Sequence, residues 1–445
     1  MENRKSVWGW ALYDWANSAF ATTVMAGFFP IFFKQYWSAG TDITVSTAQL
    51  GFGNSLASLG VAFLAPVLGA IADKGYAKKR FLLFFAYLGV GMTAALFWIQ
   101  QGAWLWAIVV YSLGVVGFSG ANVFYDSLLP AVAGEDRIDR ISSLGFSMGY
   151  LGGGLLFLLN VLMTLKPEFF GLPDAGLAVR ASFVSVALWW GLFTLFTIAW
   201  VPESRDKRIK STRTPIVAGY QQLLRTFKKI KHMKVILLFL LAYWFYMDGV
   251  STIIRMAVDY GLSLGFQTND LILALLIVQF VGFPAALAFG KLGQAWGARP
   301  TIFLAIAAYI GITLWGTMMQ TTHEFYRLAV MIGLVQGGIQ ALSRSYYSRL
   351  IPWNQSAEFY GFYNMLGKFA AILGPALMGG VGLLVRRMLL PDSPTGDQLL
   401  QTGQLATRWS LGSIVLLFCI GGVLFYFVDE AEGRNQIPAL ADEGE

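Results

Sequence analysis

Long apolar stretches separated by short polar turns dominate the pattern of this chain. About twelve of these stretches are long enough to cross a bilayer as helices, for which roughly 20 apolar residues are needed. The chain is 56% hydrophobic and only 13% charged, unlike a water-soluble globular domain. The pattern therefore predicts an all-α integral membrane protein. The expected spans are 8–33, 48–72, 81–101, 104–127, 142–165, 179–201, 235–258, 271–291, 301–320, 326–350, 360–385 and 407–428.

A polar turn signature occurs twice along the chain. The first copy is Gly69-x-x-x-Asp73-Lys74-Gly75, with Arg80 closing the basic run behind it. The second copy, about 221 residues later, is Gly290-x-x-x-Gln294-x-x-Gly297. Repetition at about half the chain length predicts two homologous halves in tandem, with a substrate site between them.

Positive charge is concentrated in alternate loops. Most of the 32 Lys and Arg residues lie before the first expected span or in the even-numbered loops. The positive-inside rule then places both termini in the cytoplasm. Apolar residues repeat at helical spacing within the basic central segment, which predicts an amphipathic helix on the anionic inner leaflet. The expected units are a six-helix bundle over 1–201, this linker over 202–234, a second six-helix bundle over 235–428 and an acidic cytoplasmic tail over 429–445.

Cysteine and histidine usage argues against several kinds of chemistry. One cysteine forbids a disulfide within the chain, and two distant histidines make a metal site built from His and Cys improbable. No Ser-His-Asp set can be assembled from them either, so we expect no cofactor and no enzyme activity. The net charge of +7 comes from loop residues, so nucleic acid is not an expected partner.

Charged and polar side chains inside the expected spans are the strongest functional signal after the repeat. A charge in hydrocarbon costs about 2.5–3.5 kcal/mol on insertion scales, so these side chains must face a protein interior or a wet cavity. They form one stripe of helical period on each of the first, fourth, seventh and tenth expected helices, and one lysine lies on the eleventh. The predicted substrate-binding residues are Asp14, Asn17, Asn122, Tyr125, Asp126, Asp248, Arg255, Gln336, Gln340, Arg344 and Lys368.

The depth of these residues suggests partners. Asp14 and Arg344 both lie toward the cytoplasmic half of their helices, which allows an ion pair between the two halves. Such a pair would be a gate, a substrate clamp or a structural contact. Asp248 lies near mid-membrane, where burial favours the protonated form, so it is the predicted carrier if transport is driven by protons. Arg255 and Asp259 are four residues apart and would also pair locally.

The intact turn signature predicts a conformational latch. Asp73 ends the second expected helix, where its carboxylate would accept hydrogen bonds from backbone amides at the start of the eleventh helix, near Glu358. Gln294 cannot carry charge, so any latch in the second copy should be weaker. The predicted latch residues are Gly69, Asp73, Gly75 and Arg80.

Two motifs carry a family resemblance. The turn signature resembles the loop between helices 2 and 3 of the major facilitator superfamily. The first helix resembles the signature of the autophagy-related vacuolar amino-acid effluxers and their bacterial relatives, a branch of that superfamily. The matching residues are Trp10-Ala11-Leu12-Tyr13-Asp14-Trp15-Ala16-Asn17-Ser18 and Asn122-x-x-Tyr125-Asp126-Ser127-x-Leu129-Pro130.

The resemblance implies twelve transmembrane helices in two pseudo-symmetric six-helix bundles, with helices 1, 4, 7 and 10 around a central cavity. It also implies a latch that holds the outward-open form, and export of neutral amino acids. The chain lacks the Arg-x-x-x-Gly element that many proton-coupled facilitators carry on helix 4, which leaves proton coupling open.

These observations predict a secondary active transporter of a small polar or zwitterionic solute, a neutral amino-acid exporter in the first place, in a bacterial inner membrane. Asp14 or Asp248 would hold the ammonium group of a zwitterion, and Arg255 or Arg344 its carboxylate. Expected partners are this solute, a possible coupling proton and anionic lipids, with a monomer as the working unit. The alternatives are a lipid or drug exporter of the same fold, and a non-transporting membrane sensor or scaffold that uses the basic linker.

Overall fold

The computed structural model describes residues 4–40, 49, 65–73, 77–202, 233–263, 266–369, 373–389 and 395–441. The predicted basic linker lies almost entirely outside these residues, as does Gly75 of the predicted latch. The side chains of Arg255, Asp259 and Lys368 are likewise outside the description.

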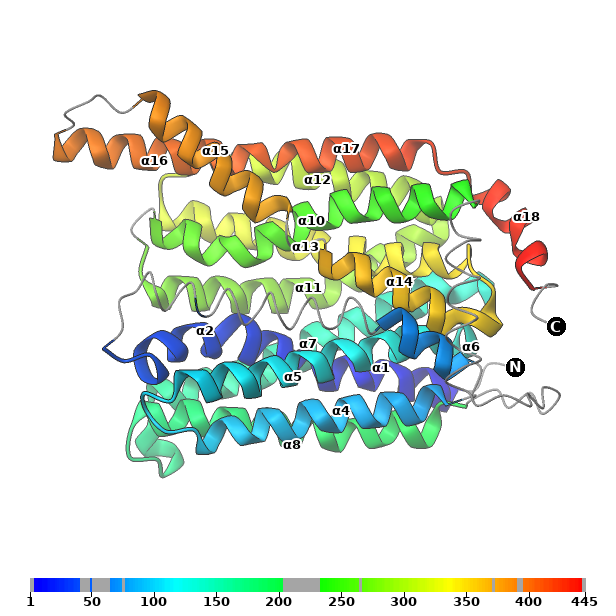
Figure 1. The fold of residues 1–445 in the computed structure, drawn as a ribbon, viewed down its shortest axis with the longest axis horizontal. Helices are drawn as coiled ribbons and strands as arrows, with labels where there is room; N and C mark the ends of the chain where they lie inside the picture. Colours follow the sequence, from blue (N-terminus) through cyan, green and yellow to red (C-terminus); the bar gives the residue numbers. More distant parts are fainter. Residues whose placement is uncertain are drawn as a thin grey trace.

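Long helices lie side by side along one axis of the molecule, and the described residues contain no strand (Figure 1). The first span runs from Arg4 to Trp37 as α1 (Arg4–Ala19), a π-helical stretch (Phe20–Phe28), α2 (Phe29–Phe32) and a second π-helical stretch (Phe33–Trp37). The rest of the N-terminal half comprises helical residues 65–73, α4 (Lys78–Ala95), α5 (Trp104–Ser127), α6 (Leu129–Val132), α7 (Ile138–Leu165) and α8 (Ala175–Trp200). The C-terminal half comprises α10 (Lys234–Ser263), α11 (Thr268–Trp296), α12 (Ala298–Met318), α13 (Thr322–Ser348), α14 (Ser356–Phe369), α15 (Leu373–Leu389), α16 (Gly396–Ser413), α17 (Val415–Tyr426) and α18 (Glu430–Ala441).

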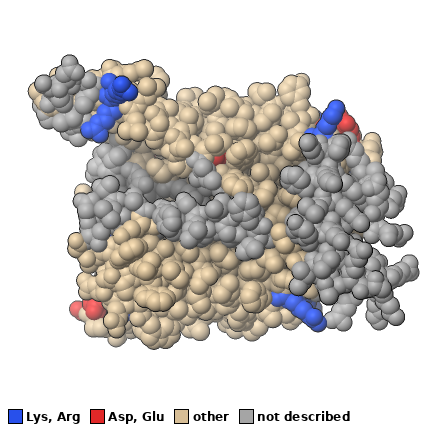
Figure 2. All heavy atoms as spheres, viewed as in Figure 1, with Lys and Arg blue, Asp and Glu red and all other residues tan. Residues whose placement is uncertain are grey.

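The helices have the lengths and surfaces of membrane spans. Within the described residues, 10 helices are long and apolar enough to cross a bilayer. The flanks of the face in Figure 2 are almost free of charge, and the coloured Lys, Arg, Asp and Glu atoms gather mainly near its two ends. Large apolar side chains such as Trp106 and Leu188 are exposed along the flanks, as expected for contact with lipid.

Two expected spans are only partly described. Most of the second, 48–72, lies outside the description, and its last part is helical. In the eleventh, expected over 360–385, the structure describes α14 and α15, and residues 370–372 lie outside the description. Pro375 lies in the first turn of α15, where the missing proline N–H does no harm.

Each half has its own hydrophobic core. One core gathers buried residues from Trp10 to Val201, and the other gathers residues from Met233 to Val428. Leu276 and Ala357 of the C-terminal half join the first core, so the halves pack against each other there. The start of α1 and the tail helix α18 lie at the same end of the molecule, here called the terminal end (Figure 1).

Side-chain caps fix helix starts at the opposite end. Asp174 accepts a hydrogen bond from the amide of Leu177 (2.7 Å) at the start of α8. Thr321 and Glu324 form a capping box at the start of α13. These caps satisfy amides that the first helical turn leaves without partners.

Candidate functional site

A cavity of about 310 Å³ lies between the two halves. This volume is at the lower end of the range for small-molecule pockets, about 300–1,000 Å³. Carboxylates, carboxamides and aromatic rings all contribute to its wall. Its lining is Asp14, Asn17, Ser18, Ala21, Thr22, Phe118, Asn122, Tyr125, Asp126, Phe146, Gly149, Tyr150, Tyr243, Met247, Gln279, Gln336, Gln340, Arg344, Tyr363 and Asn364.

The structure brings most of the predicted substrate-binding residues to this cavity. The four stripes lie on α1, α5, α10 and α13, and three of them contribute the predicted residues that line it. These residues are Asp14, Asn17, Asn122, Tyr125, Asp126, Gln336, Gln340 and Arg344.

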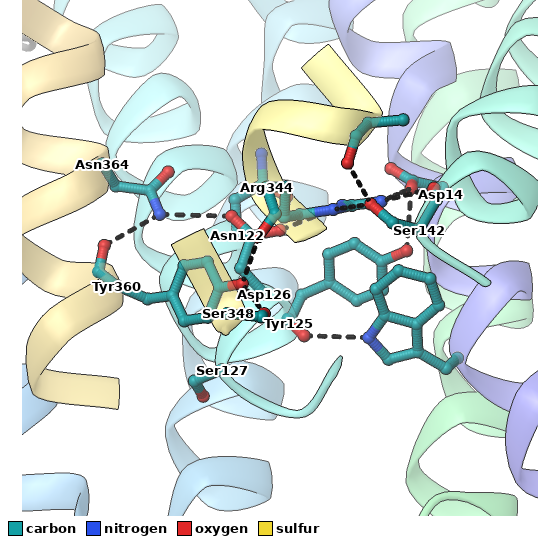
Figure 3. Close-up of polar contacts among 12 residues, drawn as sticks. Asp14, Asn122, Tyr125, Asp126, Ser127, Ser142, Arg344, Ser348, Tyr360 and Asn364 are labelled. Atoms are coloured by element: carbon teal, nitrogen blue, oxygen red, sulfur yellow. Dashed lines mark hydrogen bonds and ion pairs between the residues drawn. The ribbon is translucent and has the colours of Figure 1, made fainter. Parts of the chain in front are cut away.

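Arg344 is the centre of a buried ionic cluster at the cavity. Its Nη1 donates to Asp126 Oδ1 (3.0 Å), and its Nη2 lies 3.6 Å from Asp14 Oδ2 (Figure 3). Its Nε donates to Ser142 Oγ (3.0 Å) and its Nη2 to the Ser142 carbonyl oxygen (2.8 Å). Because Arg344 is on α13 and the other three residues are on α1, α5 and α7, this cluster ties the two halves together. The predicted ion pair between Asp14 and Arg344 is therefore present, with Asp126 as a second and closer carboxylate.

Aromatic rings enclose the same guanidinium group. The Arg344 Cζ atom lies 4.3 Å from the ring centre of Phe146, 4.7 Å from that of Trp10 and 5.4 Å from that of Tyr125. Rings at such distances attract a cation through their electron-rich faces, by up to about 2 kcal/mol when water is excluded. Only 3% of the Arg344 surface is exposed, so the charge is neutralised by protein groups and not by solvent.

Polar partners hold the two carboxylates in place. Tyr125 donates its hydroxyl to Asp14 Oδ2 (2.7 Å), and Asn364 of α14 donates its amide to Asp126 Oδ2 (3.2 Å). The Asn17 side-chain amide donates to Asn122 Oδ1 (2.6 Å), which links α1 to α5 beside the cavity. The cavity wall is thus set by hydrogen bonds within one half and by α14 of the other.

Further contacts between the halves lie between the cavity and the terminal end. Ser142 donates to the carbonyl oxygen of Ala341 (2.7 Å). Asp139, at the start of α7, accepts hydrogen bonds from Ser345 and Arg349 at the end of α13. Paired polar groups therefore join the two halves between the cavity and the terminal end.

The predicted latch contact is part of this closure. Asp73 accepts hydrogen bonds from the amides of Glu358 (2.7 Å) and Ala357 (3.2 Å) at the start of α14, and Lys78 pairs with it at 2.8 Å. Gly69 allows the approach, because a Cβ atom there would lie 2.2 Å from the carbonyl oxygen of Ala357. Arg80, also predicted for the latch, is exposed on α4.

Asp248 has a different setting from the other predicted residues. It is fully buried, does not line the cavity, and accepts hydrogen bonds from the amides of Gly374 (2.8 Å) and Leu373 (3.0 Å) at the start of α15. Thr252, one turn along α10, also donates to it (3.2 Å). The carboxylate therefore caps a helix that begins inside the expected eleventh span.

Several residues of the site were missed from the sequence. Ser142, which accepts hydrogen bonds from Arg344, and Phe146, which lines the cavity, lie four residues apart on α7. Asn364 of the cavity lining is on α14, outside the four stripes. The spacing of Ser142 and Phe146 and the nearby Gly145 indicate that one face of the fifth expected helix is closely packed. Neither Ser142 nor Phe146 is charged, so neither was predicted as a site residue. Gln279 of α11 was also missed, and it donates to Thr22 of the first span (3.0 Å).

The two helical halves and the polar cavity between them are those of a major facilitator transporter. A sequence profile described as "Vacuole effluxer Atg22 like" matches residues 2–50 and 39–382. The chain belongs to this Atg22-like family, as the resemblance in its first helix predicted.

Two relatives and two solved structures agree with this assignment. An uncharacterized MFS-type transporter of Bacillus subtilis (strain 168), YxiO, is 37% identical over 96% of this chain and 97% of its own length. Autophagy-related protein 22 of Coccidioides immitis (strain RS) is 23% identical over 85% of this chain and 82% of its own. The proton:xylose symporter XylE shares the fold with a TM-score of 0.66 at 13% identity, over 97% of this chain and 96% of its own. The human organic anion transporter MFSD10 does so with a TM-score of 0.65 at 14% identity, over 95% of this chain and 99% of its own.

Proposed function

We propose that this transporter exports a small zwitterionic solute, a neutral amino acid in the first place, by alternating access between its two halves. The observation that carries the proposal is a cavity of about 310 Å³ whose wall combines carboxylates, carboxamides and aromatic rings. An amino acid presents an ammonium group, a carboxylate and a side chain, and each finds partners of matching chemistry on such a wall. The effluxer family supports the direction of transport.

In this proposal the terminal end faces the cytoplasm of a bacterial cell and the membrane is the inner membrane. The basic residues before the first span and in the even-numbered loops support this orientation. The form described here is then closed to the cytoplasm, and the latch between Asp73 and α14 supports that state. The monomer is the working unit, and anionic lipids of the inner leaflet are its surroundings. A coupling proton stays part of the proposal, with Asp14 and Asp126 as the carboxylates that line the cavity.

Counterflow in proteoliposomes tests this function. Purified protein is reconstituted with unlabelled leucine or tyrosine inside, and entry of the labelled amino acid is followed. We expect counterflow that the Gln340→Ala variant loses, because its side chain lines the cavity. Gln320→Ala is the matched control, since Gln320 is exposed outside the helices. Absence of counterflow for every neutral amino acid would exclude the proposed solute class.

A further inference from the structure

Arg344 belongs to one half of the molecule, but its side chain is embedded in the other. It extends from α13 of the C-terminal half. Within the described part of the chain, its guanidinium group makes all its ionic, hydrogen-bonding and ring contacts with N-terminal residues. These residues are Trp10, Asp14, Tyr125, Asp126, Ser142 and Phe146, called here the cation seat.

The cation seat has the chemistry of a binding site for an organic cation. Two carboxylates supply charge, and three aromatic rings lie within 5.4 Å of the guanidinium carbon. Aromatic boxes with nearby carboxylates are how proteins recognise ammonium groups, because ring faces and anionic oxygens both attract a positive charge. Asp14, Tyr125, Asp126 and Phe146 also line the cavity, so the seat is open to a ligand held there.

Three residues of the seat, Trp10, Asp14 and Tyr125, are held together without help from Arg344. The Trp10 indole N–H donates to the carbonyl oxygen of Tyr125 (3.0 Å), and the two rings stack with centres 4.5 Å apart. The Tyr125 hydroxyl in turn donates to Asp14. Because these contacts lie within the N-terminal half, this part of the seat keeps its shape when the halves separate. Its binding geometry is thus prepared in advance, which lowers the entropy cost of taking up a ligand.

Separation of the halves at the terminal end must empty the seat. Arg344 then moves away with α13, and two carboxylates on a single half lose their cation. We propose that the ammonium group of the transported solute takes the vacated seat, so that solute and Arg344 compete for one position. This inference rests on the proposed export of an amine-bearing solute.

Competition of this kind explains how one cluster serves as both gate and binding site. Without solute, Arg344 returns to the seat and seals the terminal end. With solute bound, the displaced guanidinium is available to the solute's carboxylate, to which it can donate two hydrogen bonds. The substrate class is therefore a solute with a primary ammonium group, and the ammonium group contributes more to recognition than the carboxylate does.

Three ligands with one carbon skeleton test the seat on the full-length protein in detergent. Isoamylamine keeps the ammonium group of leucine without its carboxylate, and isocaproate keeps the carboxylate without the ammonium group. We expect leucine and isoamylamine to raise the melting temperature, and isocaproate not to. In Arg344→Ala, where the competitor is gone, the isoamylamine concentration for half-maximal stabilisation should fall about tenfold or more. Adding Asp126→Asn to that variant should reverse the gain.

The matched control is Arg349→Ala on the same helix. Arg349 also pairs across the halves, with Asp139, but none of the three seat rings surrounds it. Removing Arg349 weakens the contact between the halves but leaves Arg344 in the cation seat. The affinity for the amine should therefore rise less than in Arg344→Ala. If Arg344→Ala does not fold, Arg344→Lys should give an intermediate gain, because lysine keeps the charge and loses the planar fork.

Two results would overturn the seat: isocaproate binding as tightly as isoamylamine, or no gain in amine affinity for either Arg344 variant. Different results would refute the proposed function. If amines bind as expected but no amino acid shows counterflow, the proposed export is refuted and the proposed cation seat stands. If leucine shows counterflow but amines are not preferred, the cation seat is refuted and the proposed export stands.

Discussion

At the scale of single residues, Gly145 packs so closely against the ionic cluster around Arg344 that no side chain fits there. A Cβ atom at this position of α7 would lie 2.7 Å from Asp14 Oδ2 and 2.8 Å from both the Trp10 ring and the Tyr125 hydroxyl. Each of these distances is shorter than a Cβ atom tolerates. At this position α7 therefore packs against Asp14, Trp10 and Tyr125 through a glycine, and one added methyl group must displace a carboxylate or a ring.

We expect Gly145→Ala to reduce transport by about 10–100-fold, since displacement of a binding group by about 1 Å has effects of this size at enzyme sites. The measurement is counterflow, together with the melting temperature as a check of folding. Gly91→Ala on α4 is the control, because a Cβ atom there meets nothing within 4 Å. Wild-type counterflow in Gly145→Ala would show that the cluster tolerates the displacement and is not critical for transport.

At the scale of single residues, the sequence predicted where polar side chains lie along the helices better than it predicted which residues they contact. Helical spacing predicted the polar stripes, and depth along the helices predicted that Asp14 and Arg344 could pair. It could not predict that Asp126 would lie closer to Arg344 than Asp14 does, at 3.0 Å against 3.6 Å. That choice depends on how α1, α5 and α13 are rotated about their axes, which is decided by packing between helices. Phe146 was missed for the same reason, as an apolar residue whose neighbour comes from the other half.

Among the elements, the eleventh expected span shows how far helix starts could be predicted. α14 and α15 each have a carboxylate from another helix at their start, and the first of these contacts was predicted whereas the second was not. Asp73 binds the first amides of α14 and Asp248 those of α15. Gly374-Pro375 is a sign of a helix start in the sequence, but the capping residue is 126 positions away. Such a long-range partner cannot be read from local pattern.

Asp73→Asn tests the first of these caps. The amide side chain loses the charge and one acceptor oxygen, so the closed form should lose about 1.5–3 kcal/mol, as for hydrogen bonds to charged groups. Spin labels on cysteines at Trp8 and Trp296, both exposed, would report the separation of the halves at the terminal end in a Cys419→Ser background. A larger population of long distances is expected.

The second turn copy supplies the control for that experiment. Gln294 donates to the carbonyl oxygen of Asp136 and is exposed to solvent, so Gln294→Ala should shift the distances much less. Equal shifts in the two variants would mean that the charge of Asp73 does not stabilise the closed form.

Variants of Asp248 can distinguish two roles of this residue, capping the start of α15 and carrying a coupling proton. Asn at this position keeps one acceptor oxygen for α15 and cannot carry a proton, whereas Ala keeps neither property. As a cap, Asp248→Ala should lower stability by about 0.5–2 kcal/mol, while Asp248→Asn should lose less stability and retain proton-driven accumulation. Thermal unfolding and transport under an imposed pH gradient would be measured. Loss of accumulation in a well-folded Asn variant would instead support the role predicted from its depth.

On the scale of the whole molecule, the fold was predictable because few backbone structures are stable inside a lipid bilayer. The backbone in a bilayer must satisfy its own hydrogen bonds, so apolar stretches of sufficient length become helices. A repeated turn signature then indicated that the two halves are related. The closure at the terminal end was harder to predict, because it depends on contacts between the halves. Among these contacts are those of Asp73, Asp139 and Arg344.

A reversible cross-link between the halves would test whether this closure must open during transport. Ser143 on α7 and Gly290 on α11 face each other near the terminal end, and a Cβ atom built at Gly290 would lie 2.7 Å from the Cβ atom of Ser143. A small local adjustment gives the Cβ separation of about 3.5–4.5 Å found in disulfides. Cysteines at both positions, in the Cys419→Ser background, should therefore form a disulfide under mild oxidant.

If solute enters from the terminal end, that disulfide should reduce counterflow to the level of empty liposomes, and reductant should restore it. Each single-cysteine variant, treated with the same oxidant, controls for damage to other residues. The extent of cross-linking is measured on the same samples by blocking free thiols with a maleimide reagent that increases their mass. Full counterflow in a fully cross-linked sample would mean that α7 and α11 stay together throughout the cycle. The opening would then have to occur on the other side of the molecule, where residues 65–73 meet α14.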